Sequence, residues 1–158
     1  MANKVKAIPD GYSSVQVYLI QTSSAKAIEF YKRAFGAEEM VRMPGPDGTV
    51  MHAEIRIGNS VVMMSDENPA MNPTAKSPEH AKVHTAGVMI YSEDVEKLWK
   101  RAVDAGAKVE MPLADQFWGD RYGQLSDPWG HRWSLAQHVE DVAPAEMEKR
   151  MAAMMQQK

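Results

Sequence analysis

A six-residue stretch occurs twice in the chain, 68 positions apart, and this duplication constrains the fold more than any other feature. Phe30-Tyr31-Lys32-Arg33-Ala34-Phe35 matches Leu98-Trp99-Lys100-Arg101-Ala102-Val103 position by position. Further on, Gly36-Ala37 matches Gly106-Ala107 at an offset of 70. A length of 158 residues suits one globular domain or two joined small modules that share a core. The repeat favours two modules.

Each copy predicts the order strand, helix, strand, strand, strand. Apolar residues recur at helical spacing after Ser24 and after Ser92, which we expect to be the N-caps. Gly36 and Gly106 are expected to end the two helices. Turns rich in Gly, Asn and Pro separate the expected strands, which are 15–20, 38–43, 50–57 and 60–65 in the first copy and 86–91, 108–111, 120–126 and 131–138 in the second.

The segments outside the two copies complete the expected domain organisation. It is an N-terminal extension (1–12), a first module (13–66), a linker (67–82), a second module (83–140) and a C-terminal helix (141–158). The linker holds three prolines and is expected to be a connector or a mobile loop over a site.

Four methionines form a stripe along the expected C-terminal helix: Met147, Met151, Met154 and Met155. The same helix carries Glu146 and Arg150 four positions apart, the spacing of an ion pair on a helix surface. Two interpretations stay open for this segment. The helix docks on its own domain, or it is an arm that grips a partner subunit.

Charge and composition exclude several classes of function. The formal net charge is −3 and the basic residues are dispersed, so neither nucleic acid nor an anionic membrane is expected as a partner. The absence of cysteine excludes disulfides, thiolate nucleophiles and cysteine-based zinc sites. No apolar run is long enough to span a bilayer and no secretory signal follows Met1. We therefore expect a soluble, cytoplasmic protein.

Two groups of motifs resemble the vicinal oxygen chelate superfamily, which includes the glyoxalases and the bleomycin-resistance proteins. The opening helix of its module is similar to Ala27-Ile28-Glu29-Phe30-Tyr31 followed by Phe35-Gly36-Ala37-Glu38. The PhnB-like branch is similar in Met51-His52-Ala53-Glu54, in Phe117-Trp118-Gly119-Asp120-Arg121-Tyr122-Gly123 and in Asp127-Pro128-Trp129-Gly130-His131-Arg132-Trp133. The resemblance covers roughly residues 13–138.

The resemblance implies an α+β fold of two tandem βαβββ modules. In such proteins the modules form a U-shaped, mostly antiparallel sheet around a cavity, with helices on the convex side. Members include metal-dependent lyases, isomerases and dioxygenases as well as metal-free proteins that sequester drugs, so the fold leaves the function open. The resemblance also implies a homodimer.

The metal positions that the resemblance implies are largely lost from this sequence. Enzymes of the superfamily hold a divalent ion with one residue from the first strand and one from the last strand of each module. Gln16, fifteen residues before Tyr31, occupies the first of these positions. The matching position in the second module is Gly87, and the usual glutamate of the last strand is replaced by Ser134. The corresponding strand 61–65 offers neither His nor Glu. We therefore expect no complete metal site.

Strand alternation tests the remaining candidates in the first strand of each module. In the first module Val15, Val17 and Leu19 are expected to face the helices. The expected cavity side carries Ser14, Gln16, Tyr18 and Ile20. His84 lies 68 positions after Gln16 but shares its alternation with helix-facing apolar residues, so we expect it to point away from the cavity or to lie at the mouth of the strand.

The strand 50–57 carries the other polar candidates. Met51, Ala53, Ile55 and Ile57 form its apolar side. His52, Glu54 and Arg56 lie on the opposite side. The Cα atoms of His52 and Glu54 are expected to be roughly 6–7 Å apart. The pair could be a base with its orienter, two ligands of a displaced metal site with Gln16, or a hydrogen-bonded pair that shapes the pocket or lies on the surface.

Trp118 and Arg121 are candidates for ligand contact in the second module. Trp118 could stack on a planar ligand while Arg121 meets an anionic group bidentately. Alternatively, Asp120 and Arg121 brace a hairpin and Trp118 caps the core. Trp129 and Trp133 are expected to pack, as are Phe30-Tyr31 and Leu98-Trp99 on the helices.

Two hypotheses for function follow. The first is a small-molecule binding protein of bleomycin-resistance type without a complete metal site and with no cofactor. The second is a metal-dependent lyase, isomerase or dioxygenase of glyoxalase type that uses an unusual ligand set around Gln16, His52 and Glu54. The residues expected to bind the ligand are Gln16, Tyr18, His52, Glu54, Trp118, Arg121 and Ser134.

Overall fold

The computed structural model describes residues 6–156 and divides the chain between His84 and Thr85 into two compact units. The first unit contains the strands β1 (Val17–Gln21), β2 (Glu38–Pro44), β3 (Val50–Ile57) and β4 (Ser60–Asp66), and the helices α1 (Ser24–Phe35), η1 (Pro46–Gly48) and α2 (Pro78–Ala81). The second contains the strands β5 (Gly87–Tyr91), β6 (Lys108–Asp115), β7 (Asp120–Ser126) and β8 (Arg132–His138), and the helices α3 (Val95–Asp104) and α4 (Pro144–Met155).

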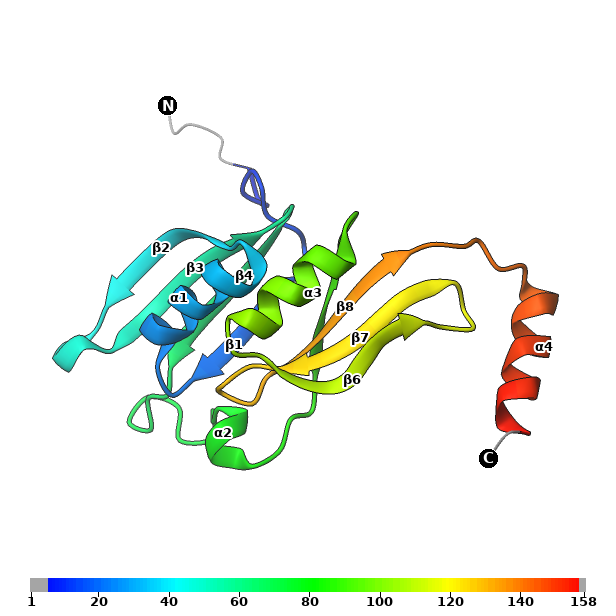
Figure 1. Cartoon of the computed structure of the whole chain (residues 1–158). Helices are drawn as coiled ribbons and strands as arrows, with labels where there is room; N and C mark the ends of the chain where they lie inside the picture. The colour runs from blue at the N-terminus through cyan, green and yellow to red at the C-terminus, as the bar shows by residue number, and fades with distance from the viewer. Residues whose placement is uncertain (1–5, 157–158) are drawn as a thin grey trace. The chain divides into compact units, whose positions relative to one another are not determined.

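Both units have the same topology, which confirms the α+β fold with two βαβββ modules (Figure 1). The strand order is β1-β4-β3-β2 in the first unit and β5-β8-β7-β6 in the second. In each sheet the first and last strands of the module pair in parallel and the other pairs are antiparallel. The repeat in the sequence therefore encodes a repeat in the structure.

One helix lies on one face of each sheet, and within residues 6–156 the opposite face is not packed against a helix of the same unit. Helix α1 buries its apolar stripe, including Ile28, Phe30 and Tyr31, against buried Ala53 and Ile55 of β3. The face of a sheet that lacks this cover is called its open face below.

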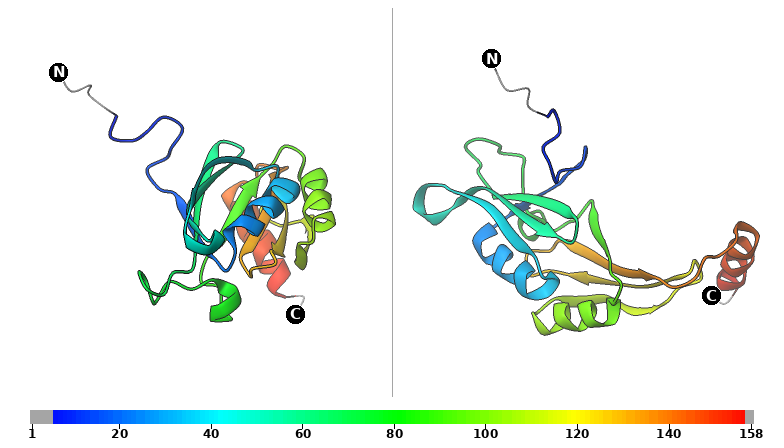
Figure 2. Two further views of the ribbon diagram at one scale, coloured as in Figure 1. Left: turned by 90° about the vertical axis from the view of Figure 1, so that its left-hand side faces the viewer. Right: turned by 90° about the horizontal axis from the view of Figure 1, so that it is seen from above.

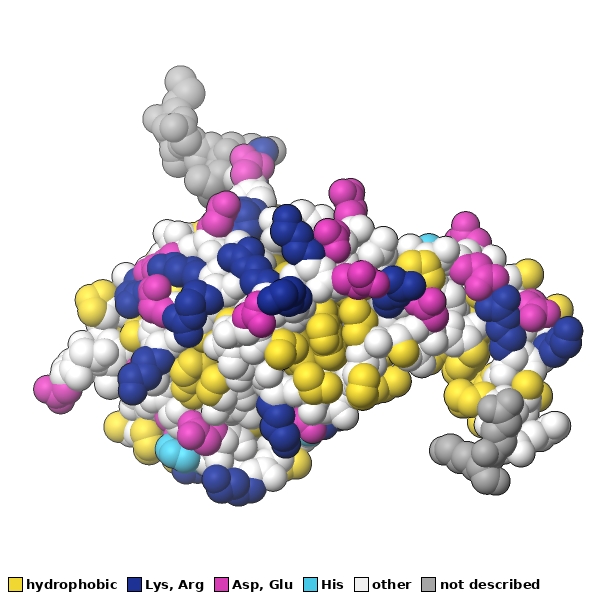
Figure 3. Space-filling view, viewed as in Figure 1, with side chains coloured by type: hydrophobic (Ala, Val, Ile, Leu, Met, Phe, Trp, Pro, Cys, Tyr) yellow, Lys and Arg dark blue, Asp and Glu magenta, His cyan; other side chains and the backbone are white. Residues whose placement is uncertain are grey.

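Helix α3 is less buried than its counterpart α1. Only Val95 and Ala102 of α3 are buried, and Leu98 and Trp99, which were expected to be core, are half-buried. Trp99 lines a depression of about 430 Å³ with Val109 and Leu113. Figure 3 shows hydrophobic side chains gathered over α3 and β6, the region of this depression.

The expected N-caps Ser24 and Ser92 are both wrong. The N-caps are Ser23 and Asp94, and in each module a residue near the end of the last strand accepts a hydrogen bond from the first helical N–H. Asp66 Oδ1 lies 2.5 Å from the Ser24 nitrogen and Gln137 Oε1 lies 3.2 Å from the Val95 nitrogen. These contacts span 42 residues, so local spacing gives no sign of them.

The same contacts correct the alignment of the two first strands. Ser24 and Val95, the first residues of α1 and α3, lie 71 positions apart, as do Asp66 and Gln137, so the structural offset there is 71, against 68 for the match in the sequence. His84 therefore corresponds to Ser13, and the residue that corresponds to Gln16 is Gly87. It is exposed and precedes β5.

The start of the first strand also differs from expectation. β1 begins at Val17, so Val15 and Gln16 precede the sheet. Val15, which was expected to pack against the helices, is 84% exposed, whereas Leu19 is buried as expected. The Gln16 side chain donates its hydrogen bond to the Ser13 carbonyl. A local turn replaces the first two expected strand positions.

Helix α4 forms where the methionine stripe predicts it, and Figure 2 shows it at the C-terminal end of the second unit, beyond β8. None of its described residues is buried. The expected ion pair is present, with Arg150 Nε 3.0 Å from Glu146 Oε1. Arg150 also forms two hydrogen bonds with Glu140, each 2.8 Å long, which attach the helix to the segment after β8. Neither α4 nor any other helix among residues 6–156 has the length and hydropathy required to cross a bilayer.

Gly119 provides a test of the tight turn between β6 and β7. It has a φ of 96°, and its carbonyl accepts hydrogen bonds from Val139 and Glu140. A Cβ atom there would lie 2.1 Å from the Glu140 carbonyl oxygen. Gly119→Ala is expected to lower the free energy of unfolding by at least about 2 kcal/mol, from the left-handed backbone and the clash together.

Gly106→Ala is the matched control for this measurement by chemical denaturation. Gly106 has a φ of 109° and no atom within 4 Å of an added Cβ, so only the backbone cost of about 1–2 kcal/mol applies. Equal losses in the two variants would refute the clash at Gly119.

Candidate ligand-binding site

The open face of the first sheet carries a row of side chains from three neighbouring strands. Tyr18 of β1 and Glu54 of β3 both lie opposite Met63 of β4, one on each side. Directly opposed residues on neighbouring strands point to the same face. Tyr18 and Glu54 therefore lie on the same face of the first sheet.

Four polar side chains are linked by hydrogen bonds across this face. The Tyr12 hydroxyl donates to Glu54 Oε2, and Glu54 Oε1 lies 3.0 Å from His52 Nε2. His52 Nδ1 lies 3.2 Å from the Tyr18 hydroxyl. We call Tyr12, Glu54, His52 and Tyr18 the polar relay. Its members come from the segment before β1, from β1 itself and from β3.

The carboxylate of Glu54 fixes the direction of these hydrogen bonds. Glu54 is only 8% exposed, and burial alone would raise its pKa. Hydrogen bonds from His52 and Tyr12 outweigh burial, and the pKa of Glu54 lies below its ordinary value. An ionised Glu54 accepts from both neighbours, which leaves His52 Nδ1 free to accept from the Tyr18 hydroxyl.

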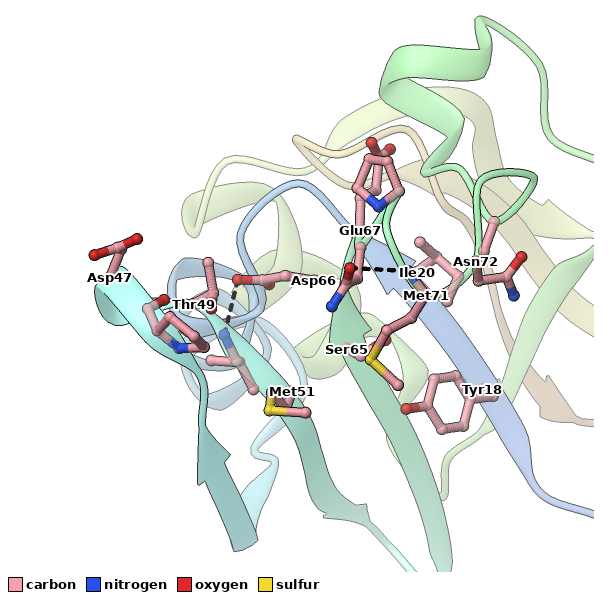
Figure 4. Close-up of a pocket in the computed structure, with 15 residues that line it drawn as sticks. Tyr18, Ile20, Asp47, Thr49, Met51, Ser65, Asp66, Glu67, Met71 and Asn72 are labelled. Carbon is pink, nitrogen blue, oxygen red and sulfur yellow. Dashed lines mark hydrogen bonds between the residues drawn. The ribbon is translucent and has the colours of Figure 1, made fainter.

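Tyr18 also forms part of the wall of a cavity of about 600 Å³ in the first unit. Figure 4 shows the side chains around it, among them Tyr18, Met51 and Met71. Met51 was expected to pack on the apolar side of β3, but it is half-exposed and lines the cavity instead. The volume lies in the range of small-molecule sites.

The segment after β4 supplies one wall of the cavity through Asn68, Met71 and Asn72. Three hydrogen-bond contacts hold this loop. Glu67 accepts from the Ser77 backbone N–H at 2.6 Å and lies 2.8 Å from His80 Nδ1, and the Thr22 hydroxyl donates to Glu79 at 2.5 Å. The segment expected as a linker thus contains the short helix α2 and borders the cavity, and whether it acts as a loop over a binding site stays a prediction.

The second unit has its own polar cluster, centred on the buried carboxylate of Asp120. Asp120 accepts from the Tyr91 hydroxyl at 2.9 Å and from Trp118 Nε1 at 3.2 Å. Its other oxygen lies 2.8 Å from His138 Nδ1. Burial raises the pKa of Asp120, but these three hydrogen bonds outweigh it and lower the pKa. Trp118 is therefore held by the carboxylate and packs edge to face on Tyr122 at 5.5 Å between ring centroids.

The remaining expected site residues in the second unit separate onto two faces. Ser134 lies on the open face, where its hydroxyl is 2.8 Å from that of Tyr122. Arg121 follows the alternation of Gly123, whose added Cβ would touch Trp99 of α3. Arg121 binds Asp115 and Glu96, as the bracing alternative predicted. The structure thus separates Arg121 from Trp118 and Ser134, and its role as a ligand contact stays a prediction.

Whether these residues fit a divalent metal depends on the donors that converge. Among the described residues, no group of three or more His, Cys, Asp or Glu side chains is arranged to hold an ion. His52 and Glu54 are adjacent, but both oxygens of Glu54 already have partners, and Gln16 is engaged with Ser13. The donor set around Gln16, His52 and Glu54 does not match the coordination that a catalytic divalent ion requires.

Sequence reasoning missed two contributors to this face. Tyr12 lies in the segment expected as an N-terminal extension, 42 positions from its partner Glu54. Met71 lies in the expected linker. In the sequence, the contact of Tyr12 with Glu54 is signalled only by an aromatic residue shortly before the first strand. No local pattern indicates that Met71 lines the cavity.

The Glu67 contacts predict a pH-dependent contribution to stability. Burial raises the pKa of Glu67, but its hydrogen bonds with Ser77 and His80 lower it to about 2 from an ordinary 4.5. Because the folded pKa is depressed, the contribution is complete above about pH 4.5 and is lost as the pH falls toward 2. Glu67→Gln is expected to lose about 1–3 kcal/mol at pH 7 by urea denaturation, and less as the pH approaches 2.

Glu29→Gln is the control, since this exposed carboxylate on α1 forms surface ion pairs worth at most about 1 kcal/mol. A Glu67→Gln deficit that is the same at pH 2.5 and pH 7 would contradict the assignment.

Comparisons with known proteins agree with this geometry. The family model of the Glyoxalase/Bleomycin resistance protein/Dioxygenase superfamily matches residues 14–135. The Mycobacterium tuberculosis protein Rv0887c is 41% identical over 142 residues, which are 86% of this chain and 81% of that protein. The crystal structure of TioX from Micromonospora sp. ML1 is similar with a TM-score of 0.64 and 29% identity, covering 80% of this chain and 99% of TioX.

A PhnB protein from Bacillus cereus shares the fold, with a TM-score of 0.60 and 20% identity over 79% of this chain and 99% of that one. The family match runs from the residues just before β1 to residue 135 within β8, and so covers β1, β3, β7 and the first half of β8. The chain belongs to the Glyoxalase/Bleomycin resistance protein/Dioxygenase superfamily.

Proposed function

We propose that this protein binds a small organic molecule in the cavity of its first unit, without a complete divalent metal site. The observation that carries the proposal is that Tyr18 belongs both to the cavity wall and to the polar relay. A ligand that fills the cavity therefore contacts a hydroxyl whose position is set by His52 and Glu54.

The composition of the cavity supports binding of a molecule with both apolar and polar parts. Ile20, Met51 and Met71 offer apolar surface, and Thr49 and Asn72 offer hydrogen-bonding groups. Methionine side chains adapt to ligands of varied shape because their thioether chains are flexible and polarisable.

The second candidate is a metal-dependent lyase, isomerase or dioxygenase of glyoxalase type. The adjacency of His52 and Glu54 favours it, because an imidazole oriented by a carboxylate can move a proton. Two observations weigh against a metal centre at this position: both carboxylate oxygens of Glu54 already have hydrogen-bond partners, and the Gln16 side chain is bonded to the Ser13 carbonyl. We therefore rank binding first.

We propose further that the protein acts in the cytoplasm as a homodimer. The Met-rich helix α4, whose described residues are all at least partly exposed, is the segment that we propose to contact a partner subunit.

The proposed site can be tested with protein that carries ¹³C-methyl methionine and a library of small organic fragments. Ligands of the cavity are expected to shift the methyl signals of Met51 and Met71, and to leave Met154 of α4 unchanged. Tyr18→Ala is expected to weaken binding of such ligands by about tenfold, equivalent to about 1.4 kcal/mol, measured by titration of the same signals.

The control is Tyr122→Ala, a tyrosine on the open face of the other sheet. If Tyr122→Ala lowers the affinity for these ligands and Tyr18→Ala does not, the binding site lies outside the cavity of the first unit. Stoichiometric nickel, zinc or manganese in protein purified without chelators, lost in Gln16→Ala and His52→Ala, would overturn the metal-poor proposal in favour of the second candidate.

A further inference from the structure

We propose that Tyr18 is a nucleophile that takes up acyl groups from activated esters with an apolar chain. This inference goes beyond binding, because it assigns a reaction to a side chain of the cavity wall. The preference for an apolar chain rests on the proposed function, whereas the reactivity of the phenol does not.

The Tyr18 hydroxyl contacts a base that is itself oriented by a third group. It donates to His52 Nδ1 at 3.2 Å, and His52 Nε2 donates to Glu54 Oε1 at 3.0 Å. A hydroxyl, an imidazole and a carboxylate linked in this order form the arrangement that activates nucleophiles for acyl transfer. Glu54 is the positioning residue, since it holds the imidazole with an unprotonated Nδ1 toward the phenol.

The hydroxyl is also accessible to a reagent. Tyr18 is 48% exposed and belongs to the cavity wall. Figure 4 shows its hydroxyl end pointing across the sheet toward Met51, which lines the same cavity. Ile20 and Met71 add apolar surface to the wall. An ester whose chain occupies this cavity can therefore present its carbonyl carbon to the Tyr18 oxygen.

The second unit contains the same residue types in a different arrangement. Tyr91 is 59% exposed, but its hydroxyl donates to Asp120 at 2.9 Å, and this hydrogen bond raises the pKa of Tyr91. The two ring nitrogens of His138 lie 2.8 Å from Asp120 and 2.9 Å from Asp141, so both face carboxylates. Tyr91 is thus at least as exposed as Tyr18 and differs in having a carboxylate, a weaker base than imidazole, as its partner.

The proposed reaction is a single acyl transfer. The Tyr18 oxygen attacks the carbonyl carbon of the ester while the phenol proton passes to His52 Nδ1. The bond between that carbon and the leaving oxygen then breaks, and the leaving group departs with the electron pair. The products are O-acyl Tyr18, the leaving anion and an imidazolium that Glu54 stabilises until its proton is lost to water.

The reaction is tested with 4-nitrophenyl butanoate on the full-length protein. The acylation rate of each tyrosine is measured by mass spectrometry of proteolytic peptides after short exposures. Tyr18 is expected to react about 100-fold faster than Tyr91, the lower end of what a positioned base contributes. Exposure alone predicts the reverse order, since Tyr91 is the more exposed of the two.

His52→Gln is expected to slow the acylation of Tyr18 by about 100-fold, because an amide can accept a hydrogen bond but does not take up the phenol proton. The matched control His138→Gln makes the same change beside Asp120 and is expected to leave the Tyr18 rate unaltered. Tyr18→Phe is expected to abolish the fast release of 4-nitrophenolate. The shorter ester 4-nitrophenyl acetate is expected to acylate Tyr18 more slowly than the butanoate.

The outcomes separate this inference from the proposed function. If Tyr18 and Tyr91 react at equal rates, or His52→Gln leaves the Tyr18 rate unchanged, the reactive phenol is overturned and the cavity remains a binding site. Fast release of 4-nitrophenolate that persists in Tyr18→Phe overturns Tyr18 as the nucleophile. Equal rates with acetate and butanoate overturn the chain preference. If no small molecule shifts Met51 or Met71 while Tyr18 still reacts faster than Tyr91, the proposed binding function fails and the reactive phenol stands.

Discussion

The structure of each module depends on one long-range hydrogen bond at the start of its helix. In the first module Asp66, at the end of β4, accepts from the first N–H of α1, and Gln137 of β8 makes the equivalent contact with α3. A helix N-terminus has unpaired N–H groups and a partial positive charge, so a carboxylate there is favourable. Asp66 also accepts from Val50 of β3, which joins the helix to two strands. This contact helps to seat the helix on one face of the sheet and leaves the other face open.

The open face of the first sheet can carry a buried carboxylate because its partners are built into the same face. An unpaired buried charge costs several kcal/mol, whereas one with two donors is tolerated. Glu54 has such donors in His52 and Tyr12, and its lowered pKa reflects them. The consequence for ligands is that the Tyr18 hydroxyl has a fixed partner before anything binds. A site organised in this way avoids part of the cost of ordering side chains on binding.

Sequence reasoning predicted the fold and one face of the site, and it failed where contacts are long-range. The repeat, the helical spacing around Phe30 and Leu98 and the alternation of 50–57 predicted both modules and the common face of His52 and Glu54. The serine N-caps were wrong because residues 42 positions away supply the contact. The strand position of Gln16 was wrong because a local turn with Ser13 delays the start of β1 to Val17. Tyr12 and Met71 were missed since they lie outside the repeated unit, where no periodicity constrains them.

The central claim is that Glu54 and Tyr18 hold the imidazole of His52 in one orientation. The most direct measurement is the ¹⁵N spectrum of the His52 ring at a pH where the ring is neutral. Our account predicts a single tautomer with the proton on Nε2, facing Glu54, and Nδ1 accepting from Tyr18. Glu54→Gln is expected to mix the tautomers, because an amide can donate as well as accept. A proton on Nδ1, or a mixture of tautomers that Glu54→Gln leaves unchanged, would contradict the polar relay.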